Sequence, residues 1–463
     1  MVNLAVIDYI IIVIFFLIVA FIGFYFGRKA ESENEFQLGG KNVGLLLFIV
    51  TNVSTWYGGI LGVGEFSYRY GLTSWFTQGL PYYVFAFLFA ILLSGKINVG
   101  GLYSIPQKFR VEYGDLVGKI AAIFIFFLVS PAPYFLMLSV IFQALFGVSN
   151  IIGLLLAVIV SVPYIIIGGY KSDIFTDIFD FIVMFVGFII ILIFTVSIYG
   201  DYSFLLKKLP ETHLSLTGGV SPFFISVWFL IALWTFADPG FHQRTTSAKS
   251  GKIAKWGIIL SIPLWALFDF LTTSTGLYAR AVFPNLDIPA FSYLLLAETV
   301  LSPGFKGIFY SALFATILST ANSFVFLSGT TIGNDLFSSS KKLGIKKNSQ
   351  IGIIISTVVS FIIAFSIPSV IEIWYTIGSI FIPGMIILVF GAYYSKLKVS
   401  INIAGAELLM GSFASLFWFS LQKLFPFSEV ITTIEPMLIG LAVALIVHIY
   451  GLFLNRLKMK NSL

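Results

Sequence analysis

Apolar runs of about 20 residues recur along this 463-residue chain, and they constrain its fold more than any other feature. Hydrophobic residues make up 58% of the sequence and charged residues only 10%, whereas soluble domains carry about 25% charged residues. A helix of about 20 apolar residues is long enough to cross the hydrocarbon core of a bilayer. We therefore expect an all-α polytopic membrane protein, folded as a single transmembrane domain over residues 1–463.

A hydropathy window of about 20 residues predicts thirteen transmembrane helices. The predicted spans are 5–26, 44–65, 74–95, 118–146, 150–170, 175–199, 221–243, 256–281, 305–333, 350–369, 371–393, 402–422 and 429–452. The first span has no basic segment before it and ends in Gly27, Arg28 and Lys29. We expect it to be a retained helix rather than a signal peptide.

The distribution of Lys and Arg predicts the orientation, because these residues are retained on the cytoplasmic side of a membrane. If the N-terminus lies outside, segments on the cytoplasmic side hold 21 of the 27 Lys and Arg residues. We expect a multi-pass protein of the cell inner (plasma) membrane, with the N-terminus outside and the C-terminus in the cytoplasm. The formal net charge of +6 follows from this topology and requires no nucleic-acid partner.

Several kinds of chemistry are excluded by what the sequence lacks. It has no cysteine, which excludes disulfides, zinc-thiolate sites and cysteine nucleophiles. It has no Walker-type Gly-x-x-x-x-Gly-Lys-Ser/Thr motif, and no nucleophile and base occur together. His242 and His448 have no metal-ligating residue at a useful spacing. We expect neither enzyme activity nor an organic cofactor.

Two predicted spans are interrupted by residues that disfavour a helix. The second contains TNVSTWYGGILGVG (51–64) with four glycines, and the seventh contains LWTFADPGFHQR (233–244) with Asp, Pro and Gly in succession. In a bilayer, such breaks occur where the freed backbone groups face protein or a water-filled cavity. An alternative stays open, because glycines also let membrane helices pack closely.

The two interruptions lie five spans apart, in spans that run in opposite directions. This arrangement predicts an inverted repeat of residues 44–199 and 221–393, as in transporters that bind solute and coupling ion near the membrane midplane. Residues 1–43 would form a peripheral first helix and loop. Residues 402–463 would form two peripheral C-terminal helices and a tail.

A polar trio of Thr316, Ser319 and Thr320 lies within the apolar stretch FATILSTANSF (314–324). The i, i+3, i+4 spacing places the three side chains on one face of a helix. Their hydroxyl oxygens, together with carbonyl oxygens freed in the broken second span, suit a hard cation such as sodium. As an alternative, each hydroxyl can bond back to the preceding turn of its own helix.

Five motifs resemble the sodium:solute symporter family. They are FQLGGKNVG (36–44), TNVSTW (51–56), GGYKSDIFTDIFDFIVM (168–184), HQRTTSAKSGKIAKWG (242–257) and ATILSTANSFVFLSGTTIGNDLF (315–337). Asp180 stands where glutamine is usual, Asn322 replaces the usual aspartate, and Asn52 lies where sodium-coupled proline transporters have an aspartate. The resemblance extends over nearly the whole chain.

The resemblance implies a leucine-transporter-type fold with five plus five core helices, one helix before the core and two after it. It also implies one bound sodium ion (Na+) between the second and ninth spans as the coupling ion. Carried over by position, the sodium ligands are the backbone carbonyls of Val50, Val53 and Thr316 and the hydroxyls of Ser319 and Thr320.

The solute is expected at the midplane between the two broken spans. The segment TWYGG resembles the choline-transporter form of the motif, in which aromatic residues surround a quaternary ammonium group. The candidate solute-binding residues are Asn52, Ser54, Trp56, Tyr57, Gln78, Tyr134, Trp234 and Asp238. Amino acid, carboxylate, sugar and quaternary amine stay open as solute classes, although we expect no arginine in the core spans that could clamp a carboxylate.

Two aspartates are candidates for coupling. Asp269 lies near the centre of the eighth span, where a carboxylate costs roughly 2.5–3.5 kcal/mol to insert unless it is paired or faces water. A structural carboxylate bonded to a neighbouring Thr or Ser is the alternative for this residue. Asp177 shares a helix face with Asp180 near the predicted cytoplasmic end of a span, where solvation or a helix N-terminus would satisfy both.

These observations favour a sodium-coupled secondary active symporter that imports a small organic solute by alternating access. A proton-coupled symporter of the same fold that uses Asp269 is the main alternative, and a solute-sensing membrane protein is a further one. The expected partners are the solute, the sodium ion and the lipid bilayer, with the chain acting as a monomer.

Overall fold

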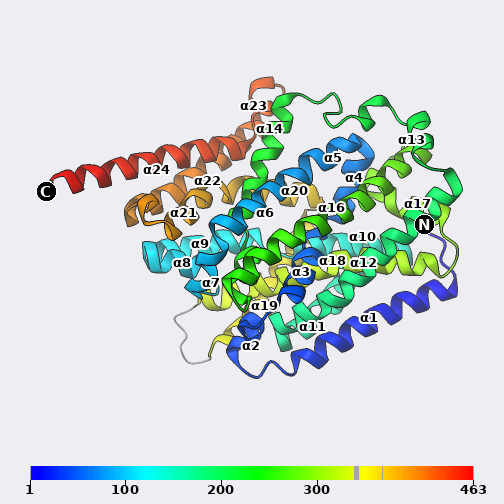
Figure 1. The fold of residues 1–463 in the computed structure, drawn as a ribbon, viewed down its shortest axis with the longest axis horizontal. Helices are drawn as coiled ribbons and strands as arrows, with labels where there is room; N and C mark the ends of the chain where they lie inside the picture. Colours follow the sequence, from blue (N-terminus) through cyan, green and yellow to red (C-terminus); the bar gives the residue numbers. More distant parts are fainter. Residues whose placement is uncertain (1, 338–343, 368, 462–463) are drawn as a thin grey trace.

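The computed structural model describes residues 2–337, 344–367 and 369–461, and most of these residues are helical. The described residues form no β-strand, and Val43 and Ala248 make an isolated bridge. The long helices lie side by side in one elongated bundle (Figure 1). The prediction of an all-α membrane protein is confirmed.

The helices that build the bundle are α1 (Val6–Gly27), α3 (Leu45–Ser54), α4 (Ile60–Tyr70), α5 (Leu72–Gln78), α6 (Leu80–Leu92), α9 (Asp115–Leu128), α10 (Ala132–Phe146), α11 (Asn150–Gly168), α12 (Tyr170–Tyr199), α14 (Pro222–Ile231), α15 (Pro239–Ser247), α16 (Gly251–Val282), α18 (Phe305–Thr330), α19 (Gly344–Ser366), α20 (Val370–Phe381), α21 (Pro383–Tyr393), α22 (Ile401–Leu424) and α24 (Pro436–Asn461). Shorter helices connect them: α2 (Glu33–Leu38), α7 (Ser94–Gly100), α8 (Ile105–Tyr113), α13 (Tyr202–Lys208), α17 (Ser292–Val300) and α23 (Glu429–Thr433).

The number of spans is close to the predicted thirteen. Ten segments of the described chain are long and apolar enough to cross a bilayer, and two bent helix pairs raise the number to twelve if each pair is one span. The remaining predicted span, 371–393, corresponds to α20 and α21, which Ile382 separates. Proline at the first position of α21 cannot continue the preceding helix. The count of thirteen therefore stays a prediction.

The second and seventh predicted spans are both broken, as their glycines and the Asp-Pro-Gly sequence predict. α3 and the following 3-10 turn η2 (Thr55–Tyr57) meet α4 at 61°. α14 and its 3-10 extension η4 (Ala232–Ala237) meet α15 at 41°. Asp238 caps the new helix, since its Oδ1 accepts a 2.8 Å hydrogen bond from the amide of Phe241. The interruptions are confirmed, whereas the inverted relation of the two halves stays a prediction.

Helix α18 lies at the centre of the bundle. The apolar window of the segment that contains it is 94% buried, whereas the corresponding windows of α1 and α12 are 28% buried. α1, α10, α11, α12 and α19 all pack against it. Polar side chains on α18 must therefore find their partners inside the protein, because leaving them unbonded in an apolar environment costs several kcal/mol.

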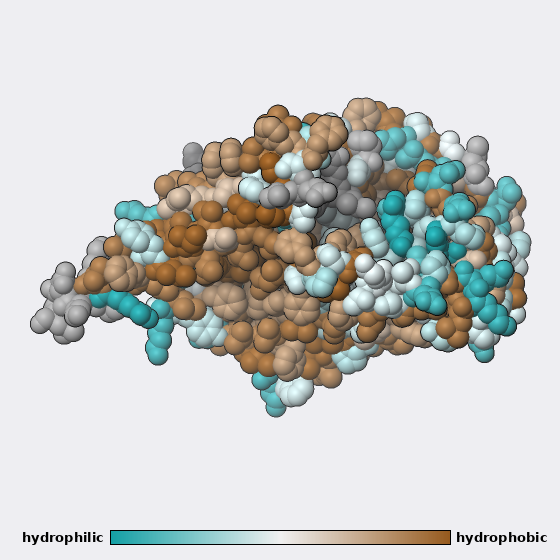
Figure 2. Space-filling view, turned by 90° about the horizontal axis from the view of Figure 1, so that it is seen from above, coloured by the Kyte–Doolittle hydropathy of each residue, from teal (hydrophilic) through white to brown (hydrophobic). Residues whose placement is uncertain are grey.

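The outer surface is suited to lipid. α1 lies along one edge of the bundle and the packed pair α22 and α24 along the opposite edge (Figure 1). Large side chains are exposed on these helices, among them Phe21 (68%), Phe413 (68%) and Ile446 (67%). Figure 2 shows hydrophobic side chains over most of the left and middle of one face, with hydrophilic side chains gathered at the right end. Such a surface is stable in hydrocarbon rather than in water.

Candidate ion and solute site

The polar trio of α18 is buried, and its hydroxyls have different partners. Thr320 Oγ1 donates to the carbonyl oxygen of Thr55 at 2.7 Å, and Ser319 Oγ donates to Asp177 Oδ1 at 2.6 Å. Thr316 Oγ1 instead bonds back to the carbonyls of its own helix, at 2.8 Å and 3.0 Å. Two of the three hydroxyls therefore reach other elements, and the third adopts the alternative that the sequence left open.

Thr55 joins α18 to the broken second span, although the sequence analysis did not single it out. It begins the turn η2, so its carbonyl lies where α3 has ended and α4 has not begun. The approach of Thr320 requires glycine at position 58, because a Cβ there would lie 2.4 Å from both Cβ and Oγ1 of Thr320. Val50 and Val53 lie on α3, on the N-terminal side of this contact.

A buried charge cluster of Asp173, Asp177, Asp180 and Arg244 adjoins the trio. It corrects two expectations from the sequence. Arg244 is one of the 21 basic residues that the predicted topology places in cytoplasmic segments. It is only 4% exposed, and its Nη2 donates to Thr55 Oγ1 at 2.6 Å and to Ser323 Oγ at 2.9 Å. Asp177 and Asp180 have no exposed surface. The prediction that water could solvate these two carboxylates is therefore wrong. The core does contain a buried arginine.

Asp173 is a further member of this cluster. It is fully buried, and its Oδ2 accepts a 2.6 Å hydrogen bond from Ser323 Oγ. Together with Asp177 and Asp180 it repeats at i, i+4 and i+7 on α12, a spacing that places three acids on one helix face. That spacing was a signal in the sequence, but it could not show that α18 and Arg244 cover this face.

A cavity of about 330 Å³ lies between the two broken spans, and we call it the solute cavity. Of the predicted solute residues, those that line it are Asn52, Trp56, Tyr57, Gln78, Tyr134, Trp234 and Asp238. Ser54 is fully buried, and its Oγ lies 3.4 Å from the carbonyl oxygen of Thr51. Asp269, Thr320 and Arg244 also line the cavity, which brings the trio and the charge cluster to its wall.

Aromatic rings form much of the cavity lining, and those missed from the sequence include Tyr82 and Trp374. Trp56 packs against Tyr82 with ring centroids 5.0 Å apart, and Tyr134 packs against Trp374 at 6.0 Å. Trp374 lies close to the start of α4, because a Cβ at Gly59 would be 2.7 Å from its ring. Tyr82 and Trp374 carry no polar or sequence-motif signal that distinguishes them from the many interfacial aromatic residues of a membrane protein.

The carboxylates of the cavity differ in their surroundings. Asp238 is partly exposed in the cavity, with one oxygen engaged at the start of α15. Asp269 is nearly buried and accepts a hydrogen bond from the Tyr83 hydroxyl. Asp269 is therefore partnered, by a tyrosine rather than by the Thr or Ser that the sequence analysis considered.

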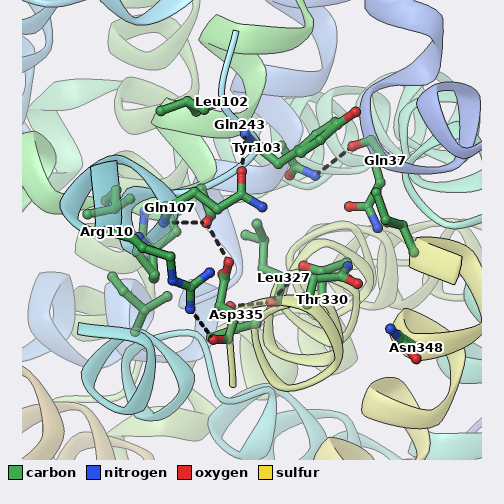
Figure 3. A pocket seen from close by; sticks show the side chains of 18 of the residues that line it. Gln37, Leu102, Tyr103, Gln107, Arg110, Gln243, Leu327, Thr330, Asp335 and Asn348 are labelled. Atoms are coloured by element: carbon green, nitrogen blue, oxygen red, sulfur yellow. Dashed lines mark hydrogen bonds between the residues drawn. The ribbon is translucent and has the colours of Figure 1, made fainter. Parts of the chain in front are cut away.

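A second cavity of about 460 Å³ lies on the other side of α15, and we call it the α8 cavity. Arg110 Nη2 donates to the carbonyl oxygen of Asp335 at 2.7 Å, and these residues lie together at the wall of the cavity (Figure 3). Gln243 and Leu327 line the α8 cavity, whereas Arg244 and Phe324 line the solute cavity. α15 and the part of α18 around Phe324 and Leu327 therefore lie between the two cavities.

The model of the sodium:solute symporter family matches residues 36–412. The chain belongs to this family. Membership confirms the resemblance that the sequence motifs predicted, and it makes the chain a multi-pass membrane transporter for which sodium is the implied coupling ion.

Two relatives align with most of this chain. The sodium/proline symporter 2 of Staphylococcus saprophyticus subsp. saprophyticus is 25% identical over 464 aligned residues, which cover 91% of this chain and 89% of that protein. The sodium/proline symporter of Staphylococcus aureus is 26% identical over 352 residues, covering 71% of this chain and 68% of that protein.

Solved structures show the fold. A substrate-bound outward-open state of a Na+-coupled sialic acid symporter superposes with a TM-score of 0.82 at 15% identity and covers 98% of both chains. A nucleobase-cation-symport-1 family transporter in a closed conformation gives a TM-score of 0.53 at 13% identity and covers 90% of this chain and 93% of that one. The fold is that of leucine-transporter-type symporters, as predicted.

Proposed function

We propose that this protein is a sodium-coupled symporter that moves a small organic solute by alternating access. The observation that supports this most directly is the contact between Thr320 and the carbonyl of Thr55, because it joins the polar trio to the break in the second span. Oxygen atoms of a broken helix and of a facing helix are what transporters of this kind use to bind sodium.

The proposed sodium ligands are the carbonyls of Val50, Val53 and Thr316 and the hydroxyls of Ser319 and Thr320. Ser319 is well prepared for this role, since its hydroxyl proton already points to Asp177 and leaves the oxygen lone pairs for a cation. The Asp177 carboxylate adds a negative charge next to the ligand in a low-dielectric interior, where such attraction is strong.

The proposed solute carries a cationic amine. Asp238 offers a carboxylate in the solute cavity, and Trp56, Tyr134 and Trp374 offer ring faces that attract a cation. Arg244 also reaches the cavity, but it is hydrogen-bonded into the charge cluster. The two relatives that are sodium/proline symporters agree with a solute of this class, because proline contains an amine.

The two cavities support the transport mechanism that we propose. α15 and the part of α18 around Phe324 and Leu327 lie between them. Movement of these two segments relative to α12 would open one cavity to the central site while closing the other. The proposal also places the N-terminus outside the cell and the C-terminus in the cytoplasm.

The first test is sodium-dependent thermal stabilisation of the purified protein at constant ionic strength in choline-free buffer. We expect wild type to gain stability with rising sodium, by about 2.7 kcal/mol at a hundredfold excess over the dissociation constant. Ser319→Ala combined with Thr320→Ala should abolish the gain. Ser311→Ala is the matched control, because this buried hydroxyl on the same helix bonds only to the carbonyl of Gly307 within the described residues.

The second test uses saturating sodium to screen solutes. Choline, proline, a sugar and acetate are added in turn, and we expect stabilisation by the amines that Asp238→Asn weakens. If wild type shows no sodium response but a pH response that Asp269→Asn removes, the sodium proposal is wrong. Proton coupling through Asp269 would then be the better account, since this residue lines the same cavity.

A further inference from the structure

The three acids on α12 do not have equal surroundings. Asp173 accepts a hydrogen bond from Ser323, and Asp177 accepts one from Ser319 with Thr55 Oγ1 at 3.4 Å from its other oxygen. Asp180 is as deeply buried as the other two. Neither of its oxygens has a hydrogen-bond donor among the described residues.

An ionised carboxylate in this position is unfavourable. The charges that act on Asp180 are those of Asp177 and Asp173, which have the same sign. Burial of an isolated carboxylate without donors costs tens of kcal/mol in an apolar medium by Born solvation, so such groups become neutral instead. Asp180 needs either a bound cation or a proton.

Within the described part of the chain, neighbouring elements supply no positive charge to Asp180. α11 contributes Tyr164, whose hydroxyl donates to Asn322 Oδ1 on α18 at 2.9 Å, and α15 contributes Arg244, which bonds to Thr55 and Ser323. The charged groups on the other elements that pack against α12 are engaged or placed elsewhere. Lys252 and Lys255 lie in the first two turns of α16, where Lys252 is exposed. The others have partners: Asp8 with the amides of Gly304 and Gly307, Glu33 with the amide of Ile345, Glu35 with Lys171, Lys41 with the carbonyl of Asn98, Asp269 with Tyr83, Arg280 with the Tyr68 hydroxyl, and Glu298 with Lys306.

A metal ion shared by the acids does not fit. No group of three or more His, Cys, Asp or Glu side chains in the described part of the chain is placed to hold a metal ion. The sodium position proposed above faces Asp177 through Ser319, and Asp177 lies one helical turn from Asp180.

We propose that Asp180 binds a proton and is a neutral carboxylic acid in the folded protein. The charge cluster of Asp173, Asp177, Asp180 and Arg244 then has a net charge of −1. One sodium ion at the polar trio would balance it. This last step rests on the proposed function, whereas the proton on Asp180 does not.

Infrared spectroscopy of the purified protein tests the proton directly. A protonated carboxyl group has a carbonyl stretch that is separate from the carboxylate bands and shifts in D₂O. We expect Asp180→Asn to remove one such band and Asp269→Asn to retain it. A wild-type spectrum without the band, or a band that survives in Asp180→Asn, would overturn the proposal.

Sodium binding gives the second readout. Asparagine has the shape and charge of the neutral acid, so Asp180→Asn should fold and should keep the sodium midpoint within about threefold of wild type. A change of tenfold or more, or a variant that does not fold, would show that the negative charge of Asp180 is needed and that it is ionised. If wild type has no sodium response while the infrared band behaves as expected, the proposed function fails and the proton site stands.

Discussion

The hydroxyl of Thr320 donates a 2.7 Å hydrogen bond to the carbonyl oxygen of Thr55, and this bond joins the central helix α18 to the break between α3 and α4. Gly58 makes this approach possible, because a side chain at position 58 of the broken span would clash with Thr320. The geometry brings hydroxyl and carbonyl oxygens from two distant parts of the chain together inside the bundle.

Gly58→Ala should abolish sodium-dependent stabilisation and lower the unfolding free energy by about 1–3 kcal/mol, the usual range for overpacking. The added Cβ would lie 2.4 Å from Thr320, so α18 must move away from the broken span. Gly62→Ala is the control, since its Cβ would lie 3.7 Å from Trp374, an ordinary contact distance. Thermal unfolding at increasing sodium measures both effects. A Gly58→Ala protein with the wild-type sodium midpoint would contradict the proposed site.

Asp177→Asn should weaken sodium binding by at least about tenfold, which corresponds to about 1.4 kcal/mol. The reason is the loss of a buried negative charge that contacts Ser319. Asp269→Asn should leave the sodium midpoint unchanged, because Asp269 bonds to Tyr83 at the solute cavity. Sodium titrations of the two variants at constant ionic strength distinguish the two acids. Equal losses in both would argue against a sodium site at the trio.

Arg244→Gln should lower the unfolding free energy by about 3–5 kcal/mol, as expected when one partner of a buried charge network is removed. It leaves Asp173 and Asp177 without the positive charge on α15, which is linked to them through Ser323 and Thr55. Combining it with Asp173→Asn should cost less than the sum of the two single changes, because one of the two carboxylates left without a counter-charge is then also removed. The measurement is denaturant or thermal unfolding in one detergent.

The control for this prediction is Arg69→Gln, which removes an exposed pair with Glu65. Surface pairs of this kind contribute about 0.2–1 kcal/mol. If the two arginine variants lost similar stability, the buried position of Arg244 would have no energetic consequence.

Single cysteines can report the two cavities separately, because the natural sequence has none. Gln78→Cys places a thiol in the solute cavity and Thr330→Cys places one in the α8 cavity. Under alternating access, sodium should change the labelling rates of the two variants in opposite directions. Leu206→Cys, at a position that is 54% exposed, should label at a constant rate. Rates that rise or fall together would contradict alternating access between these cavities.

Much of the fold was readable from local sequence. Hydropathy predicts the helices because a bilayer requires continuous apolar segments. The breaks in the second and seventh spans were predicted because glycine and proline act on their own backbone. The polar trio was found by helical spacing within an otherwise apolar span.

The sequence by itself determined the membrane class, the broken spans and the identity of the candidate sodium hydroxyls. Only the tertiary structure decided that Thr55 meets Thr320, that Arg244 enters the core and that Asp180 is buried with no hydrogen-bond donor among the residues that the structure describes. Helical periodicity shows which residues share a face, but it does not show which neighbour covers that face. Whether an acid near a predicted span end faces water or protein depends on the packing of α12 against α18, which no local pattern contains.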